Sequence, residues 1–183
     1  EGRREEALDL FLQHYPVGDA QVHEEIASLA ADLGRTETAR RHWTENLDAG
    51  DPYASQARRG LMRTALDTGE AEPAWEHYRA LVDAGQGESV SEEELLTLGE
   101  LLLDTDTPAR AAGPLEAFLD RGGTPEDPAA LYYNLGRIYE ENRDPRGAAD
   151  YYRRVVDGFP LSPYWERAEA RVQYLRRHFF DIR

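Results

Sequence analysis

The chain repeats one pattern of small and large apolar residues with a period of 35 to 37 residues. The repeat is visible in four evenly spaced pairs of an alanine and, four residues later, a large apolar residue: Ala39/Trp43, Ala74/Tyr78, Ala111/Leu115 and Ala148/Tyr152. Two residues that are four apart lie on the same face of an α-helix. A repeat of this length indicates stacked helical units, because one such unit cannot bury its apolar face without a neighbour.

A second helical pattern precedes each of these pairs. The clearest copies are Tyr132-x2-Leu135-Gly136-x2-Tyr139 and, 37 residues earlier at every position, Leu95-x2-Leu98-Gly99-x2-Leu102. No alternation of apolar and polar residues competes with the helical period. The sequence therefore predicts an all-α fold in which each unit is a hairpin of two antiparallel helices.

Prolines and capping residues divide the pattern where helices should begin and end. Proline suits the first turn of a helix, where its missing N–H has no partner within the helix. Six of the ten prolines occupy such places: Pro52, Pro73, Pro108, Pro128, Pro145 and Pro163. We expect N-caps at Thr107, Asp127, Asp144 and Ser162 and a capping box from Ser91 and Glu94. Gly34 and Gly69 are expected to end the first helix of their hairpins.

The last unit resembles the tetratricopeptide repeat family. Tyr132-x2-Leu135-Gly136-x2-Tyr139, Ala148-x3-Tyr152 and Pro160 follow the spacing of that family, with Tyr132 in the usual tryptophan place. The resemblance implies an α-solenoid, a right-handed superhelix of hairpins, as one domain over residues 1–183 with units at 20–53, 55–88, 92–125 and 129–162. The first two units depart from the pattern, since His23 and Arg58 stand in the tryptophan place.

Two flanking segments complete the expected array. Residues 4–16 are expected to form half of an earlier unit, and residues 163–180 to form a capping helix. The chain begins with Glu1 inside a helical pattern, so we expect it to be a piece of a longer polypeptide. The segment Phe159-Pro160-x-Ser162-x-Tyr164-x3-Ala168 is similar to repeats in bacterial envelope lipoproteins of the outer-membrane assembly type. That likeness favours the periplasm or cell envelope over the cytoplasm.

Composition excludes several kinds of chemistry. The chain has no cysteine and no lysine, which rules out thiolate nucleophiles, cysteine metal sites, Schiff bases and a Walker A lysine. The net charge of -15 disfavours nucleic acid and anionic membranes as partners. The acids are concentrated in residues 1–128, whose net charge is -17, whereas residues 129–183 carry +2. This asymmetry favours basic partners or serves solubility.

Two segments begin like metal-binding motifs but lack residues that these motifs require. His23-Glu24-Glu25-Ile26-Ala27 begins like a zinc-protease motif but lacks its second histidine, so we interpret His23 as a residue of the helix surface. Asp104-Thr105-Asp106 begins like a calcium loop, but Ala109 and Leu115 stand where glycine and glutamate are needed, which favours a turn between helices. We therefore expect no metal, no cofactor, no small-molecule substrate and no catalytic residues.

The expected function is a non-catalytic scaffold that binds a protein or peptide partner. Tetratricopeptide arrays commonly bind such partners in the concave groove formed by the first helix of each unit. Position in the repeat assigns to this groove Arg59, Arg63, Leu96, Glu100, Tyr133 and Arg137. The arginine forks could receive carboxylates of a partner. Self-assembly into a homo-oligomer through open repeat ends, and regulation of a larger polypeptide, remain alternatives, and so does binding at the convex face or the loops.

Overall fold

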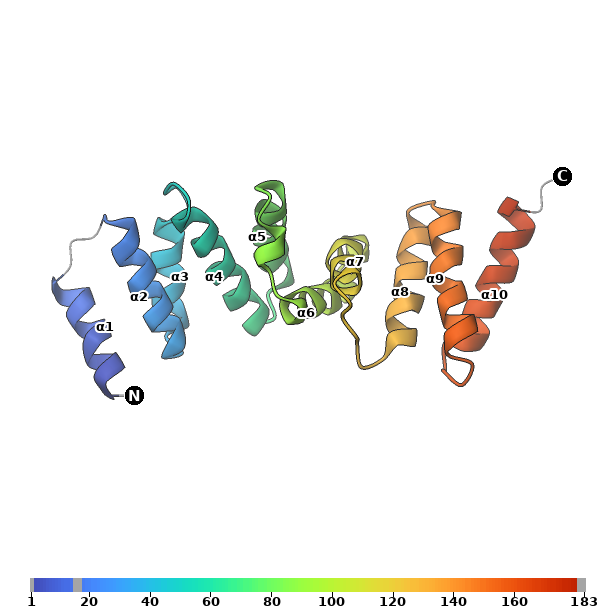
Figure 1. Ribbon diagram of the computed structural model, residues 1–183, viewed down its shortest axis with the longest axis horizontal. Helices are drawn as coiled ribbons and strands as arrows, with labels where there is room; N and C mark the ends of the chain where they lie inside the picture. The colour runs from blue at the N-terminus through green and yellow to red at the C-terminus, as the bar shows by residue number, and fades with distance from the viewer. Residues whose placement is uncertain (1, 15–17, 181–183) are drawn as a thin grey trace. The chain divides into compact units, whose positions relative to one another are not determined.

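The computed structural model describes residues 2–14 and 18–180, with the side chain of Phe180 left aside. Its contacts divide the chain into two compact units, residues 1–94 and residues 95–183. Helices make up both units, and the described residues contain no β-strand. The all-α prediction is confirmed, and within each unit neighbouring helices pair as antiparallel hairpins (Figure 1). The single domain predicted over residues 1–183 remains a prediction.

Unit 1 contains two complete hairpins and one additional helix. The hairpins pair α2 with α3 and α4 with α5, and α1 packs on α2. The helices are α1 (Gly2–His14), α2 (Ala20–Asp32), α3 (Thr36–Glu45), α4 (Tyr53–Asp67) and α5 (Ala71–Asp83), followed by the 3-10 turn η1 (Gly87–Ser89). The helices α2, α3 and α5 fall inside the expected hairpins. The helices α1 and α4 each begin two residues before the expected bounds at 4 and 55, and η1 ends one residue after the expected bound at 88.

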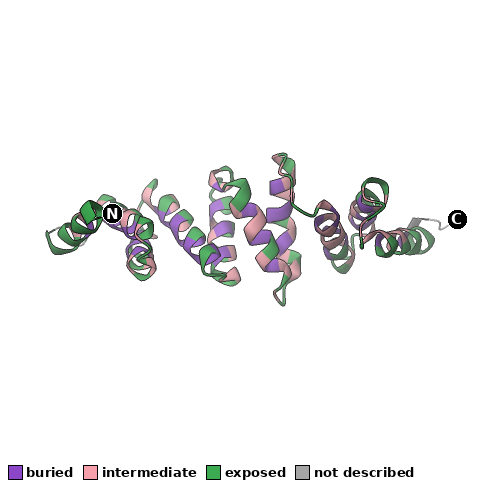
Figure 2. Ribbon diagram, turned by 90° about the horizontal axis from the view of Figure 1, so that it is seen from below, coloured by how far each residue is buried: buried purple, intermediate pink, exposed green. Residues whose placement is uncertain are grey.

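The core of unit 1 lies between these helices. Leu8 of α1, Ile26 of α2 and Trp43 of α3 belong to one buried cluster that extends to Leu61 of α4. Gly60 allows α4 to approach the ring of Trp43, because a Cβ at this position would lie 2.2 Å from a ring carbon. Figure 2 shows the buried residues on the facing sides of paired helices. Successive hairpins therefore share one continuous core.

Unit 2 continues the same plan. The helix α6 begins in the last residues of unit 1, α8 pairs with α9, and α10 packs on α9. The elements are α6 (Glu92–Leu103), η2 (Pro108–Ala111), α7 (Ala112–Asp120), α8 (Pro128–Glu141), α9 (Pro145–Gly158), α10 (Trp165–Leu175) and the π-helical turn η3 (Arg176–Phe180). The predicted capping helix is thus present as α10 with η3.

Glycine permits close packing inside the hairpins of unit 2. A Cβ at Gly136 would lie 2.7 Å from the ring of Tyr152, and a Cβ at Gly99 would lie 2.3 Å from Leu115. Both distances are shorter than a normal carbon contact, so only glycine fits without displacing its neighbour. Trp165 links α10 to α9, because its indole N–H donates a hydrogen bond to the carbonyl of Val156 at 3.0 Å.

The helix ends agree with most of the expected caps. Asp127 accepts from the backbone N–H of Ala130, and Asp144 accepts from those of Arg146 and Gly147. The predictions for Thr107 and Ser162 were wrong. Thr107 makes no side-chain cap bond, and α10 begins only at Trp165, after Ser162 has bonded the N–H of Tyr164.

The first helices of two hairpins end at the expected glycines. Gly34 and Gly69 have φ of +68° and +71°. This left-handed conformation turns the chain into the second helix at little cost for glycine. The turns of unit 1 are thus set by residues that the sequence alone identifies.

Candidate functional site

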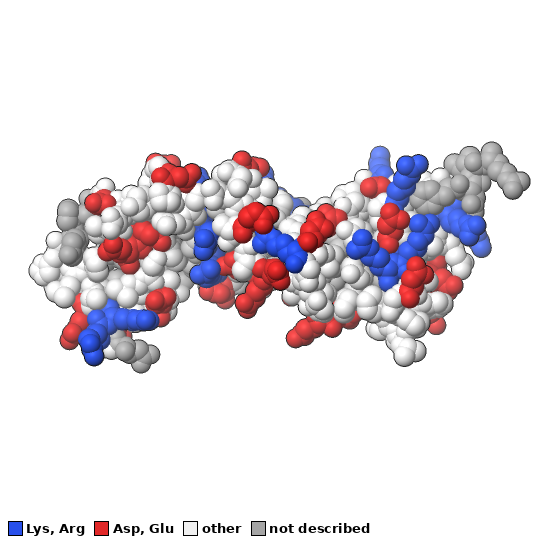
Figure 3. Space-filling view, in the orientation of Figure 1, with Lys and Arg blue, Asp and Glu red and all other residues white. Residues whose placement is uncertain are grey.

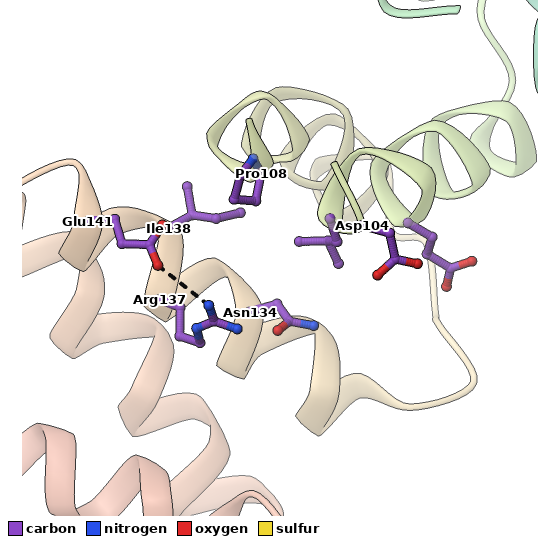
Figure 4. Close-up of a pocket in the computed structure, with 8 residues that line it drawn as sticks. Asp104, Pro108, Asn134, Arg137, Ile138 and Glu141 are labelled. Atoms are coloured by element: carbon purple, nitrogen blue, oxygen red, sulfur yellow. Dashed lines mark hydrogen bonds and ion pairs between the residues drawn. The ribbon is translucent and has the colours of Figure 1, made fainter. Parts of the chain in front are cut away.

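A hollow in unit 2 brings together residues of α6 and α8. Its volume is about 340 Å³, and Figure 4 shows Asp104 on one side with Asn134 and Arg137 across from it. We call it the first hollow, and its lining residues are Glu100, Leu103, Asp104, Pro108, Asn134, Arg137, Ile138 and Glu141. Two residues assigned to the groove from the sequence, Glu100 and Arg137, therefore face the same space.

A second hollow lies against the adjoining face of α8. Its volume is about 390 Å³, and Tyr133, Arg137, Glu140, Glu141, Tyr152 and Arg171 line it. Arg137 and Glu141 line both hollows, so the two adjoin along α8. Tyr133, the third groove residue of this region, forms part of the second hollow.

The polar side chains of the second hollow bond to one another. Arg171 of α10 forms an ion pair with Glu140 of α8, and its Nε donates to Glu140 Oε2 at 3.0 Å. The hydroxyl of Tyr152 donates to the same oxygen at 3.1 Å. Burial, followed by the neighbouring Tyr133, raises the pKa of Tyr152 above its ordinary value. The phenol of Tyr152 therefore stays protonated at neutral pH and can donate its hydrogen bond to Glu140.

Aromatic rings form one wall of the second hollow. The ring centroid of Tyr133 lies 5.5 Å from that of Tyr152 and 5.2 Å from that of Tyr164, with interplanar angles of 52° and 33°. Such tilted pairs are favourable arrangements of aromatic rings. Tyr133 is thus held by α9 and by the turn before α10 rather than projecting freely.

The charges of the first hollow are less constrained. Arg137 contacts Glu141 at 3.5 Å, and both side chains are about half exposed. Across the described residues, the carboxylates of Glu100 and Asp104 have no hydrogen-bond or ion-pair partner. This hollow therefore presents charged groups that remain available for an external group.

The groove residues assigned to unit 1 behave differently from those of unit 2. Arg59 is exposed on α4. Arg63 is already engaged, because its Nε and a terminal nitrogen both lie 2.9 Å from Glu94 Oε1. Glu94 also completes the predicted capping box with Ser91, which is confirmed by bonds of 2.8 and 3.2 Å.

The environment of Glu94 favours its charged form. Burial acts to raise its pKa, but the hydrogen bonds from the backbone of Ser91 and from Arg63 outweigh burial and lower it. Arg63 thus neutralises a carboxylate of its own chain. Leu96, the sixth assigned residue, is half-buried on α6 and lines neither hollow.

The sequence reasoning missed several lining residues. Asn134, Arg137, Ile138 and Glu141 are spaced i, i+3, i+4 and i+7, which is one face of α8. Extending that face from Arg137 would have found the other three. No sequence pattern predicts that Arg171 lines the second hollow, because its ion pair with Glu140 depends on how α10 packs.

His23 is not the surface residue that we expected. Its side chain is 5% exposed, and its Nδ1 lies 2.8 Å from Nδ1 of His42, which is 6% exposed. His23 occupies the tryptophan place of its unit, a position that faces the other helix of the hairpin. This position in the repeat could have predicted from the sequence that His23 is buried. Burial, with further contributions from His23 and Arg41, lowers the pKa of His42.

Two negative findings apply to the part of the chain that the structure describes. No group of three or more His, Asp or Glu side chains there is arranged to hold a metal ion. No helix there is both long and apolar enough to cross a membrane. The segment of Asp104, Thr105 and Asp106 is a turn between α6 and η2, as the sequence favoured.

A family model described as "Tetratricopeptide repeat" matches residues 96–163. These residues are tetratricopeptide repeats. The matched segment contains most of α6, all of α7, α8 and α9, and both hollows apart from Arg171. Members of the tetratricopeptide repeat family generally act as protein-interaction scaffolds. The narrower likeness to envelope lipoproteins stays a prediction.

The chain is also similar to uncharacterized proteins of two bacteria. It is 29% identical over 122 residues to one from Borreliella burgdorferi, which covers 65% of this chain and 35% of that protein. It is 33% identical over 54 residues to one from Treponema pallidum, which covers 28% of this chain and 10% of that protein. The matches therefore span about a third and a tenth of these relatives.

Two solved structures are similar in arrangement. The crystal structure of the MamA protein matches with a TM-score of 0.49 and 21% identity, over 86% of this chain and 81% of that one. Pseudomonas aeruginosa PilF matches with a TM-score of 0.47 and 19% identity, over 83% of this chain and 66% of that one.

Proposed function

We propose that this protein is a scaffold that binds a segment of a partner protein along α8, in the first and second hollows. The observation that carries the proposal is that the two hollows adjoin and are lined by Glu100, Tyr133 and Arg137, which repeat position alone had assigned to a partner groove. Side chains from successive hairpins meet there, which is how repeat arrays build extended binding surfaces.

The lining is suited to a peptide rather than to a small substrate. The first hollow combines apolar side chains with charged groups, and the second combines tyrosine rings with a fixed ion pair. An extended segment presents alternating side chains to such neighbouring hollows. Protein interfaces likewise combine aromatic residues and arginine with a polar rim.

Filling the first hollow tests this proposal. Asn134 is half-buried on α8, and Asn134→Phe would place a large ring in the space that a partner side chain is to occupy. Randomised peptides selected on the wild-type protein should bind this variant at least about tenfold more weakly, the loss that about 1.4 kcal/mol produces. Circular dichroism should show unchanged helicity.

The matched control is Gln173→Phe. Gln173 carries the same amide group, is exposed on α10 and lines neither hollow. It should leave peptide binding unchanged. Equal binding by wild type and Asn134→Phe would remove the first hollow from the proposed site.

A second candidate function is self-association through apolar side chains near the chain ends. Leu10 is 55% exposed on α1, and Phe179 is 50% exposed on η3. Phe179 and Tyr174 line a further hollow of about 360 Å³ with Pro145 and Leu175. Light scattering over a range of protein concentrations tests this candidate, with a paired Leu10→Ser, Phe179→Ser variant expected to stay monomeric. A wild type that is monomeric throughout would exclude it.

A further inference from the structure

The first hollow has an excess of negative charge. Glu100, Asp104 and Glu141 contribute three carboxylates, and Arg137 contributes one guanidinium. By contrast, residues 129–183 carry a net charge of +2, and Figure 3 shows arginines gathered over α8 to α10 on the face drawn. The negative charge of the hollow thus comes from Glu100, Asp104 and Glu141, and not from residues 129–183 as a whole.

The bonds within the hollow leave most of this charge uncompensated. Among the described residues, the ion pair of Arg137 is with Glu141, at 3.5 Å. In the part of the chain that is described, the carboxylates of Glu100 and Asp104 have no such partner. A cation that entered would gain attraction from both without displacing an existing ion pair. A partner carboxylate near Arg137 would instead meet these two charges.

The first hollow also has an apolar wall next to its carboxylates. Leu103, Pro108 and Ile138 supply apolar surface from α6, η2 and α8. Carboxylates alone would not define a binding site, but a lysine or arginine side chain combines an aliphatic stem with a cationic head. The stem can lie on this wall while the head reaches the carboxylates.

The second hollow differs from the first because its charges are balanced. Its two arginines, Arg137 and Arg171, equal its two carboxylates, Glu140 and Glu141, and one pair is fixed as an ion pair. The ring of Tyr133 adds an apolar face. Cation selection is therefore expected in the first hollow only.

We infer that the first hollow binds a lysine or arginine side chain of the partner segment, held between Glu100 and Asp104 with its stem against Ile138. The inference rests on the proposed function and specifies its partner. This chemistry is opposite to the carboxylate recognition that the arginines of the groove suggest by themselves. The partner's contact segment is accordingly basic at this position.

Peptide pools with one fixed central residue test this inference. The probes are fluorescent randomised pools in which that residue is Lys, Arg, Gln, Leu or Glu, and binding is measured by polarisation. Wild type should bind the Lys and Arg pools more tightly than the Gln pool, and the Glu pool most weakly. Added salt should reduce the preference, because exposed charges are screened.

Two neutralising substitutions locate the preference. A Glu100→Gln, Asp104→Asn variant should reduce the preference for Lys over Gln by about three- to tenfold, the range for two exposed charge pairs. The control Glu126→Gln, Asp120→Asn makes the same change of net charge at exposed positions outside both hollows. The control should keep the preference.

The outcomes separate this inference from the proposed function. If pools bind wild type and lose affinity in Asn134→Phe, but the Glu pool is preferred or the Lys preference survives in Glu100→Gln, Asp104→Asn, the inference is overturned and the groove stands. If the control loses the preference equally, net charge alone explains it and the inference also fails. If no pool binds wild type, the proposed function fails and the inference falls with it.

Discussion

The hairpins α2/α3 and α8/α9 are built on the same repeat pattern but are held together by different chemistry. In α8/α9, Gly136 lets the two helices approach until Tyr152 fills the space between them. In α2/α3, Ala27 takes the glycine place, and a buried hydrogen bond joins His23 to His42. The spacing of the hairpin is thus kept although the contacts inside it differ.

This difference has consequences for stability. A glycine–tyrosine contact depends on shape and is insensitive to pH near neutrality, whereas the buried ring of His42, whose pKa is lowered, costs stability when it takes up a proton. The hairpin α8/α9 contains α8, against which both hollows lie. The proposed binding surface therefore depends on the contact between Gly136 and Tyr152, which does not titrate near neutral pH.

The largest expected effect is the loss of Tyr152. Its side chain is 1% exposed and contacts α8 through Gly136 and Glu140. Tyr152→Ala should reduce the free energy of unfolding of unit 2 by about 3–5 kcal/mol, because a large cavity replaces the ring. Urea unfolding followed through Trp165 of α10 measures it. Tyr152→Phe keeps the ring and should cost about 1 kcal/mol; equal losses in both variants would show that the ring does not hold the hairpin.

A smaller effect is expected from adding one methyl group at Gly136. Gly136→Ala places a Cβ 2.7 Å from the Tyr152 ring, and such overpacking costs about 1–3 kcal/mol, more than the gain of about 1 kcal/mol in helix propensity. Gly113→Ala is the matched control, because nothing lies within 4 Å of its Cβ in α7. Hydrogen exchange of α8 should accelerate in the first variant and not in the second. Slower exchange in Gly136→Ala would refute the close approach.

Residues that recur at fixed spacing made the fold predictable from the sequence. Gly136 and Ala148 mark close packing, and Asp127 and Asp144 mark helix starts, because each role depends on neighbours within one hairpin. Thr107 failed as a cap because the segment after it begins as a 3-10 turn rather than an α-helix. Local sequence indicates a cap without fixing the geometry of the turn that follows.

The candidate site was less predictable because its contacts join separate helices. Repeat position identified Glu100, Tyr133 and Arg137, since the face of a helix follows from its period. Asp104 joins them only because the end of α6 lies opposite α8. The contact between His23 and His42, two residues 19 apart in sequence, likewise depends on the pairing of two helices.

The histidine pair predicts that acid weakens the first hairpin. The pKa of His42 is lower in the folded protein than in the unfolded chain, so the unfolded chain binds the proton more strongly. Stability should therefore be complete above the unfolded pKa of about 6.5 and decline as pH falls below it. The protection factors of α2 and α3 in hydrogen exchange should therefore be lower at pH 5 than at pH 7.5.

A histidine substitution separates this effect from general acid sensitivity. His42→Gln removes the titrating ring, and the remaining pH dependence of α2 and α3 should be flatter than in wild type. Exchange of α8 and α9 over the same range should change less, because Tyr139, whose pKa the hydrogen bond to Glu116 raises to about 12, and Tyr152 remain protonated. Equal acid sensitivity of both hairpins would contradict the comparison.

The smallest predicted effect concerns the two groove arginines that contact carboxylates. Arg63 lies 2.9 Å from Glu94, which is 12% exposed and also caps α6, whereas Arg137 and Glu141 are both about half exposed and 3.5 Å apart. Arg63→Gln should therefore cost about 0.5–1 kcal/mol, and Arg137→Gln less than about 0.5 kcal/mol. Urea unfolding at low and high salt measures both, and the Arg63 effect should persist better in salt because its partner is less exposed. An equal or larger cost at Arg137 would mean that this guanidinium is committed to its own chain, and it would then be less able to respond to a partner in either hollow.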